Sequence, residues 1–304
     1  MAAILVSGLV NLETNLRINQ FPLDYFPVTY PFYGVQNNIS GVGLNISKAL
    51  RTLGQDVRML SLVGDDLIGK MALLAIAEAN LDTRYILPVL KETAQSVILY
   101  DPMGRRQIHV DLKNIQEQVY PPDLFSQALS GSGLAVLSTI NFSRPFLKST
   151  LQAGIPIATD VHTIGSLDAD YEQDFLISAQ ILFMSNELLP VPPESFARQI
   201  FNRYGTEILI IGLGSQGVLL AVRQDNFIER IPAVATRPVV NTIGAGDALF
   251  SCFLSEDLAS GGDPYQSIRK AIVFASYKIG ESGAAQGFLD RNGLEEWYKI
   301  TFSK

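Results

Sequence analysis

The segment Asn241-Thr-Ile-Gly-Ala-Gly-Asp247 combines small residues with a carboxylate in a spacing that suits group transfer. An apolar run with helical spacing, Ala248 to Leu258, follows it directly and stops before Gly261. The first N–H groups of a helix lack intrahelical partners, and small residues let an anion approach them closely. The segment therefore predicts an anion hole, which the helix dipole favours by about 0.3–1 kcal/mol.

Asp247 stands where a carboxylate could take the proton of an attacking hydroxyl group. Gly244, Ala245 and Gly246 would meanwhile hold a transferring phosphoryl group with their amides. A base of this kind typically contributes about 10²–10⁴ in rate. The alternative is that Asp247 only caps the helix, a role that Asp often has. Because the carboxylate follows Gly-Ala-Gly directly, we predict that residues 244–247 form the catalytic centre.

Short apolar runs bounded by turn residues indicate strands that are buried on both faces. They cover residues 2–8, 56–64, 134–140, 156–161, 181–185 and 207–212. Helical patterns alternate with them, at residues 45–53, 67–79, 145–153 and 193–204. This alternation predicts an α/β fold, with a three-layer α/β/α arrangement around a doubly wound, mostly parallel sheet. We expect residues 1–304 to form a single domain.

Segments at about residues 13–40 and 95–112 interrupt the alternation and predict a small β-sheet lid. The second segment indicates a hairpin that turns at residues 101–104. Aromatic side chains crowd the first segment: Phe21, Tyr25, Phe26, Tyr30, Phe32 and Tyr33. They either pack within the lid or in a homodimer contact, or stack on a substrate ring.

Composition and charge indicate which binding partners and which cellular compartment to expect. The formal net charge of −7 comes without a basic stripe, so we expect no nucleic-acid partner. No stretch is long and apolar enough to span a bilayer, so we expect no membrane partner. Cys252 is the only cysteine, which excludes an intrachain disulfide and fits a reducing compartment. The N-terminus does not have the pattern of a signal peptide, and we expect a cytoplasmic protein.

These motifs resemble those of the ribokinase-like, or PfkB, family of carbohydrate and nucleoside kinases. In that family the last residue of Asp-Thr-x-Gly-Ala-Gly-Asp is the base. A second family signature looks like Ser40-Gly-Val-Gly-Leu-Asn45, followed by Val63-Gly-Asp-Asp66. The resemblance covers essentially the whole chain. It implies ATP-dependent phosphoryl transfer to a hydroxyl group of a small sugar, with a nucleoside as the alternative acceptor.

The resemblance also implies further site residues, which we name by their positions here. Acceptor-binding residues would be Asn11, Glu13, Gly41, Gly43, Asn45 and Arg105. Nucleotide-binding residues would be Asn186, Gly214, Gly217, Thr242, Gly283 and Ala284. Magnesium is expected with the ATP, with Glu187 as an indirect ligand. Two alternatives stay open: Asn45 as only a helix N-cap, and Asn11 as only a turn residue.

Some positions depart from the family pattern. Glu13 is one methylene longer than the usual Asp, which changes the expected size of the acceptor pocket. Asn241 replaces the first Asp of the motif, which weakens the inference that a monovalent cation activates the protein. Leu189 stands where many members carry the second acid of Asn-x-x-Glu, so the magnesium contacts stay open. A non-catalytic, ligand-binding relative is therefore a second alternative.

The segment Gly212-Leu-Gly-Ser-Gln-Gly217 spells the dinucleotide-binding fingerprint G-x-G-x-x-G. That fingerprint requires a helix directly after the glycines, to place its N-terminus under the pyrophosphate. Residues 218–222 and 227–231 instead indicate a hairpin that turns at Asp225-Asn226. The sequence therefore predicts against an NAD-dependent dehydrogenase.

Overall fold

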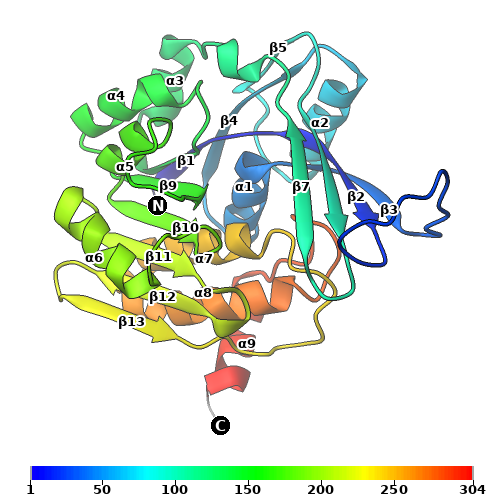
Figure 1. Cartoon of the computed structure of the whole chain (residues 1–304). Coiled ribbons are helices and arrows are strands. Elements are labelled where there is room, and N and C mark those ends of the chain that lie inside the picture. Colours follow the sequence, from blue (N-terminus) through cyan, green and yellow to red (C-terminus); the bar gives the residue numbers. More distant parts are fainter. Residues whose placement is uncertain (1, 303–304) are drawn as a thin grey trace.

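The computed structural model describes residues 2–302 and contains a nine-stranded sheet in the order β13-β12-β11-β10-β9-β8-β1-β4-β5 (Figure 1). The strands are β1 (Ala3–Ser7), β4 (Val57–Gly64), β5 (Ile86–Leu90), β8 (Ser132–Leu137), β9 (Ile157–Thr163), β10 (Ile181–Ser185), β11 (Ile208–Gly212), β12 (Val218–Val222) and β13 (Phe227–Ile231). Pairing is parallel from β5 to β11, and β12 is antiparallel to both of its neighbours. The predicted, mostly parallel sheet is confirmed.

Helices cover both faces of this sheet, because alternate strand residues point to opposite sides. Within β1, Ile4 and Val6 belong to one buried cluster and Leu5 to the other. The first cluster includes α1 (Val42–Thr52), α2 (Leu67–Glu78), α7 (Ala245–Ser260), α8 (Pro264–Lys278) and α9 (Arg291–Phe302). The second includes α3 (Pro122–Leu129), α4 (Leu147–Gln152), α5 (Gln173–Ser178) and α6 (Pro193–Arg203). The three-layer arrangement is thereby confirmed.

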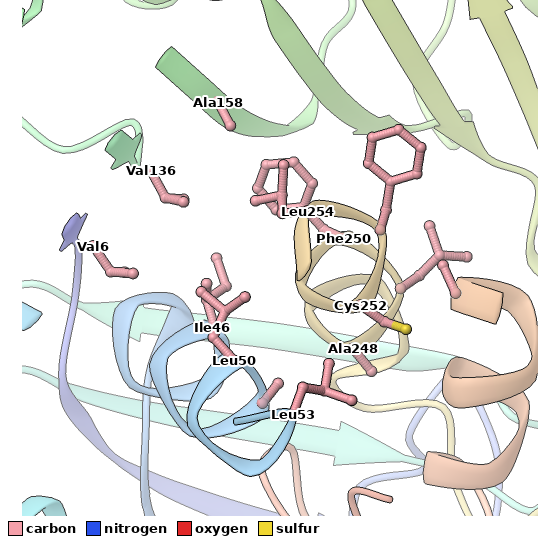
Figure 2. Close-up of a cluster of buried hydrophobic side chains, with 14 of the residues drawn as sticks. Val6, Ile46, Leu50, Leu53, Val136, Ala158, Ala248, Phe250, Cys252 and Leu254 are labelled. Carbon is pink, nitrogen blue, oxygen red and sulfur yellow. The ribbon is translucent and has the colours of Figure 1, made fainter. Parts of the chain in front are cut away.

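Helices α1 and α7 pack side by side under the middle of the sheet (Figure 2). Ile46 and Leu50 of α1 lie in the same buried cluster as Phe250 and Leu254 of α7, and Val6 of β1 faces them. Burying a side chain of this size contributes about 1.5–3 kcal/mol. This packing fixes the position of α1 relative to α7, and each of these helices begins in one of the two sequence motifs.

The lid is a separate four-stranded sheet in the order β3-β2-β6-β7. Its strands are β2 (Asn11–Arg17), β3 (Val35–Ser40), β6 (Gln95–Tyr100) and β7 (Arg106–Asp111). The hairpin turn is confirmed, with the amide of Gly104 donating to the carbonyl of Asp101 at 3.0 Å. In the first segment, residues 18–34 contain no strand. Pro22, Pro27 and Pro31 cannot donate to a ladder, which explains this gap.

Some helix boundaries differ from the predictions. α1 begins at Val42 rather than at residue 45, and Gly41 is its N-cap. α7 begins at Ala245 rather than at residue 248, and Gly244 is its N-cap. The helix predicted at residues 145–153 is a 3-10 turn, Arg144–Phe146, followed by α4. Both motif helices therefore start closer to the motif glycines than their apolar periodicity indicated.

The segment with the dinucleotide fingerprint ends in the antiparallel hairpin β12–β13. A single 3-10 turn, Gly214–Gln216, is the only helical element between β11 and β12 in the described chain. The prediction against a dinucleotide-binding helix is confirmed. Across residues 2–302, the helices are all too short or too polar to cross a lipid bilayer.

Candidate active site

The predicted site residues gather at the carboxyl edge of the large sheet. β1 lies between β4 and β8, where the strand order reverses and open parallel sheets form crevices beyond their carboxyl ends. Asn11 comes soon after β1, Asn186 directly follows β10, and Gly214 follows β11. Connections beyond one sheet edge thus bring together residues that are far apart in the sequence.

Asp247 is held by a side chain from the other motif. Its Oδ2 atom accepts a hydrogen bond of 2.7 Å from Nδ2 of Asn45, which is 202 residues away in sequence. The N-cap of α7 is Gly244, and no side chain caps this helix. The N-cap of α1 is Gly41. The two alternatives that Asp247 and Asn45 serve only as helix caps are therefore wrong.

A line of hydrogen bonds joins Asp247 to the lid. Ser40 Oγ of β3 lies 3.1 Å from both Asn45 Oδ1 and Glu13 Oε2, so its single proton can serve either acceptor. Asn15 Nδ2 donates to the other carboxylate oxygen of Glu13 at 2.9 Å. Glu13, Asn15 and Ser40 are all buried. Lid strands β2 and β3 are therefore linked by hydrogen bonds to the side chain that holds Asp247.

The surroundings of Asp247 raise its pKa from 3.8 to about 6. Desolvation is the largest cause, and the hydrogen bond from Asn45 opposes it by stabilising the carboxylate. The negative charges of Asp160 and Glu13 raise the pKa further, while His162 lowers it. A carboxylate with this pKa is largely ionised at neutral pH and is a stronger base than an exposed Asp.

Asp160 is a neighbour of Asp247 that the sequence analysis did not assign to the site. It is buried on β9, and its Oδ1 atom accepts a hydrogen bond of 2.7 Å from the backbone amide of His162. His162 Nδ1 lies 3.5 Å from the other carboxylate oxygen. Burial raises the pKa of Asp160. An acidic residue within an otherwise apolar, buried strand is the sequence signal that would have indicated it.

The amides at the start of α7 are only partly available to an anion. Among residues 2–302, the amides of Gly244, Gly246 and Asp247 have no hydrogen-bond acceptor. The amide of Ala245 donates to the carbonyl of Thr242 at 3.2 Å, which closes the turn before the helix. The amide of Ala245, which was predicted to contribute to the anion hole, is therefore engaged within the turn in this structure. Gly246 and Asp247 provide the free amides of the first helical turn.

Gly244 lies where no other residue fits. Its φ angle is 74°, and a Cβ atom there would stand 2.2 Å from the carbonyl oxygen of Ala284. Ala284 in turn forms a small apolar cluster with Ile243 and with Ile98 of the lid strand β6. The turn before α7 is thus packed between the lid and the segment at residue 284.

A cavity of about 240 Å³ borders this arrangement. Ser40 and Ala284 contribute to its lining together with Asn38, Lys48 and Gln286. Gln286 Nε2 also donates to Asn38 Oδ1 at 3.2 Å, and Gly283 packs beside both side chains. The predicted nucleotide-side residues Gly283 and Ala284 therefore lie against lid strand β3.

The two lid arginines have different contacts. Arg105 pairs with the buried Asp101 at 2.7 Å and donates to the carbonyl of Phe21, so it holds the lid turn. Arg106 reaches toward α7, where Nη1 donates to Thr242 Oγ1 at 3.2 Å and Nη2 lies 3.6 Å from Glu187 Oε1. Arg106, rather than Arg105, connects the lid with predicted nucleotide-side residues.

Asn11 is the first residue of β2, so the alternative of a turn residue is wrong. Its Nδ2 donates to Ser96 Oγ at 2.8 Å, and its buried Oδ1 has no partner among residues 2–302. A buried acceptor without a partner is costly unless a ligand satisfies it. Asn11 is therefore suited to receive a hydrogen bond from a substrate hydroxyl group.

The remaining predicted glycines of the site lie in tight turns. A Cβ atom at Gly41 would lie 2.4 Å from the carbonyl oxygen of Leu9, and one at Gly43 would lie 2.6 Å from the carbonyl carbon of Gly8. Gly217 has a φ angle of 99° and ends the turn that begins at Gly214. These glycines allow close approach of the loops at the sheet edge.

Glu187 is the acid suggested for indirect magnesium binding. Its side chain is 59% exposed and its recorded ion pair is with Arg106. Over residues 2–302, His, Cys, Asp and Glu side chains form no group of three that could hold a metal ion. Magnesium usually binds through one or two carboxylates together with substrate phosphates. A single acid such as Glu187 therefore fits a magnesium ion that is bound together with the nucleotide.

Comparison with known proteins places this chain in a family. The model of the pfkB family carbohydrate kinases matches residues 4–159 and 178–291, a range that includes both motifs. Acarbose 7(IV)-phosphotransferase of Actinoplanes sp. is 25% identical over 96% of each chain. Deoxyribokinase of Salmonella typhi is 24% identical over 98% of each chain.

Solved structures agree with this placement. The microbiome-derived acarbose kinase Mak1 is 26% identical and superimposes with a TM-score of 0.87 over 98% of this chain and 99% of its own. A putative ribokinase from Agrobacterium tumefaciens has the same fold, with a TM-score of 0.85 at 19% identity over 98% of both chains. The family match and the fold together confirm the resemblance inferred from the motifs. This chain belongs to the PfkB family of carbohydrate kinases.

Proposed function

We propose that this protein transfers the γ-phosphoryl group of ATP to a hydroxyl group of a small carbohydrate, with Asp247 as the base. The observation that carries the proposal is the position of Asp247, which is held by Asn45 directly beside the free amides of Gly246 and Asp247. A base and an oxyanion-stabilising group at one helix start are what in-line phosphoryl transfer needs. Membership of the PfkB family supports this chemistry.

In the proposed reaction, the acceptor hydroxyl oxygen forms a bond to the γ-phosphorus while the bond to the β,γ-bridging oxygen breaks. The proton of the hydroxyl group passes to Asp247, and ADP carries away the electron pair of the broken bond. The amides of Gly246 and Asp247 stabilise the negative charge of the transferring group. Asn45 keeps the carboxylate oriented, because it donates to one oxygen and leaves the other free.

The nucleotide would lie over Thr242, Asn186, Gly214, Gly217, Gly283 and Ala284. Arg106 already reaches Thr242 and Glu187, so its guanidinium is placed to contact a phosphate. Magnesium, when bound with the nucleotide, would neutralise triphosphate charge, and Glu187 would contribute to holding it. Activation by a monovalent cation stays an open part of the proposal, because Asn241 replaces the usual acid.

The acceptor would lie between the lid and α1, with Asn11, Glu13, Gly41, Gly43 and Asn45 around it and Arg105 supporting the lid turn. Both oxygens of Glu13 already accept hydrogen bonds, but Asn11 Oδ1 is unpartnered within residues 2–302. Asn11 is thus the best-supported contact for a hydroxyl group. Two similar proteins are named for acarbose, so carbohydrates larger than a single sugar belong among the candidates.

A nucleoside is the second candidate acceptor. Tyr25, Phe26, Tyr30, Phe32 and Tyr33 of the lid are between 65% and 100% exposed. Exposed aromatic rings can stack on a base, and they can also bury the lid against a second copy of the chain. We therefore keep a lid-mediated homodimer in the proposal. We also keep the proposal that the protein works in a reducing, cytoplasmic compartment, which suits a chain whose cysteine, Cys252, is free.

An acceptor panel tests the function directly. We expect Mg-ATP to yield ADP in the presence of one class among monosaccharides, acarbose-like oligosaccharides and nucleosides, with and without potassium. Product analysis by mass spectrometry should show the added phosphate on that acceptor. Ligand-induced stabilisation without ADP formation from any acceptor would instead support the non-catalytic alternative.

The hydrogen bond from Asn45 provides a sharper test of the base. Asn45→Ala removes a donor that favours the charged form of Asp247, so the pKa of Asp247 should rise above about 6. A hydrogen bond to a charged group is worth about 1.5–3 kcal/mol, which corresponds to about one pH unit or more. The acidic limb of the kcat/KM profile should move to higher pH by about that amount. An unchanged limb would contradict the role of Asp247.

A further inference from the structure

Lys278 is a fully buried lysine at the C-terminus of α8, and its side chain lacks an acidic partner. Its exposed fraction is 0%. Its Nζ atom donates to the backbone carbonyl of Ile243, and residues 2–302 offer it no other hydrogen bond and no ion pair. Lysine is almost never fully buried unless it is paired, because desolvating an ammonium group is costly. The cost of burying the Lys278 ammonium group without an acidic partner indicates a role other than stabilising the fold.

The charges nearest Lys278 include the proposed catalytic base. Burial lowers the pKa of Lys278 to about 8. The carboxylates of Asp247, Glu13 and Glu281 oppose that shift, while Arg237 adds to it. The ammonium group therefore lies in the field of the base on α7 and of the acid on lid strand β2, although it contacts neither of them directly.

The end of α8 holds the anion-hole turn at two points. The amides of Val240 and Asn241 donate to the carbonyl of Ile279 at 2.8 and 3.3 Å. Lys278, the residue before Ile279, donates a hydrogen bond from Nζ to the carbonyl of Ile243, the residue before Gly244. The turn between these anchors determines where the amides of Gly246 and Asp247 point.

We propose that Lys278 is a positioning residue for phosphoryl transfer, whose buried ammonium group fixes the turn at residues 241–244 and supplies positive charge beneath the anion hole. This inference rests on the proposed function. A buried charge without a counter-ion costs free energy that an apolar side chain of similar shape would not cost. The ammonium group of Lys278 would stabilise the negative charge that develops on the transferring phosphoryl group. A neutral side chain at this position would not do so.

Lys278→Met tests the proposal, because methionine is similarly long and unbranched but uncharged. We expect kcat to fall at least about tenfold, since the loss of one fixed donor at such a site can cost more than that. The KM for the acceptor should change little. Relief of the buried charge and loss of the hydrogen bond to Ile243 oppose each other, so the melting temperature should change little. An unchanged kcat, or a loss of kcat with a fall in melting temperature as large as that of Lys270→Met, would overturn the proposal.

Lys270→Met is the matched control on the same helix. Lys270 is also buried, but it pairs with Glu256 at 2.9 Å and with Glu295. Its replacement leaves Glu295 without a partner among residues 2–302 and leaves Glu256 with Arg291 alone, so the melting temperature should fall while kcat is retained. If both variants change stability and kcat in the same direction, Lys278 is only a structural residue.

A binding measurement separates this inference from the proposed function. ADP with magnesium and fluoroaluminate imitates the charge of a transferring phosphoryl group without requiring turnover. Calorimetry should show at least about tenfold weaker binding of this mixture to Lys278→Met, with the affinity for ADP alone nearly unchanged. Equal weakening of both would overturn the positioning role. Lack of turnover by the wild-type protein with every acceptor would instead count against the proposed function.

Discussion

Asp247→Asn is expected to lower kcat at least about 10²-fold with the best acceptor, if the base carries its usual share of the rate. Asparagine has the same size and can still accept the hydrogen bond from Asn45 Nδ2, so the site should keep its geometry. It cannot take up the proton of the acceptor hydroxyl group. ADP release under saturating Mg-ATP measures the effect.

Asp257→Asn is the matched control for this variant. Asp257 lies on the same helix, and burial raises its pKa to about 6 as well. Asp257 is half-buried, and removing its charge tests whether any acid of α7 with a raised pKa matters for turnover; we expect kcat to be retained. A wild-type-like kcat for Asp247→Asn, or similar losses in both variants, would remove Asp247 from the mechanism.

The difference in stability between Asp247→Asn and the wild type should depend on pH, because Asp247 titrates and asparagine does not. The folded-state pKa of Asp247 is raised from 3.8 to about 6, so the folded protein binds this proton more tightly than the unfolded chain. The associated stabilisation is complete below about pH 4 and is lost as the pH rises through about 6. At pH 8, where Asp247 is charged, the Asn variant should therefore melt at a higher temperature than the wild type. That advantage should shrink between pH 6 and pH 4.

The parts of the fold that follow from local patterns could be predicted from the sequence. The apolar runs at residues 181–185 and 207–212 correspond closely to β10 and β11, because strands buried on both faces leave an unbroken hydrophobic signal. The starts of α1 and α7 were predicted less accurately, because both helices begin three residues before the apolar periodicity that indicated them. Residues 18–34 were less predictable, because their aromatic content resembles a strand while their prolines prevent one.

The site was predictable only where its chemistry is local. The pairing of Asn45 with Asp247 joins two motifs whose separate patterns do not specify a contact. The bond between the amide of Ala245 and Thr242 depends on the exact turn geometry, which the residue types Gly-Ala-Gly do not determine. Lys278 ends an ordinary helical segment, and nothing in its sequence neighbourhood indicates that its ammonium group is buried. Such features depend on tertiary packing between α7, α8 and the lid.

Gly244→Ala should produce the second large loss of activity, at least about 10² in kcat. The φ angle of 74° is unfavourable for alanine, and the new Cβ atom would stand 2.2 Å from the backbone oxygen of Ala284. Backbone cannot move aside as a flexible side chain can, so the turn before α7 must shift. A displacement of about 1 Å at a reacting centre can cost about 10² in rate. Steady-state kinetics and the melting temperature should be measured together.

Gly261→Ala distinguishes this effect from backbone strain alone. Gly261 ends the same helix with a φ angle of 75°, and no atom lies within 4 Å of the position a Cβ atom would take. Both variants should lose stability, by about 1–2 kcal/mol for the left-handed backbone, but only Gly244→Ala also creates a clash and moves the amides of Gly246 and Asp247. Retained kcat in Gly261→Ala with a large loss in Gly244→Ala is therefore expected. Equal kcat in both variants would mean that the position of these amides does not limit catalysis.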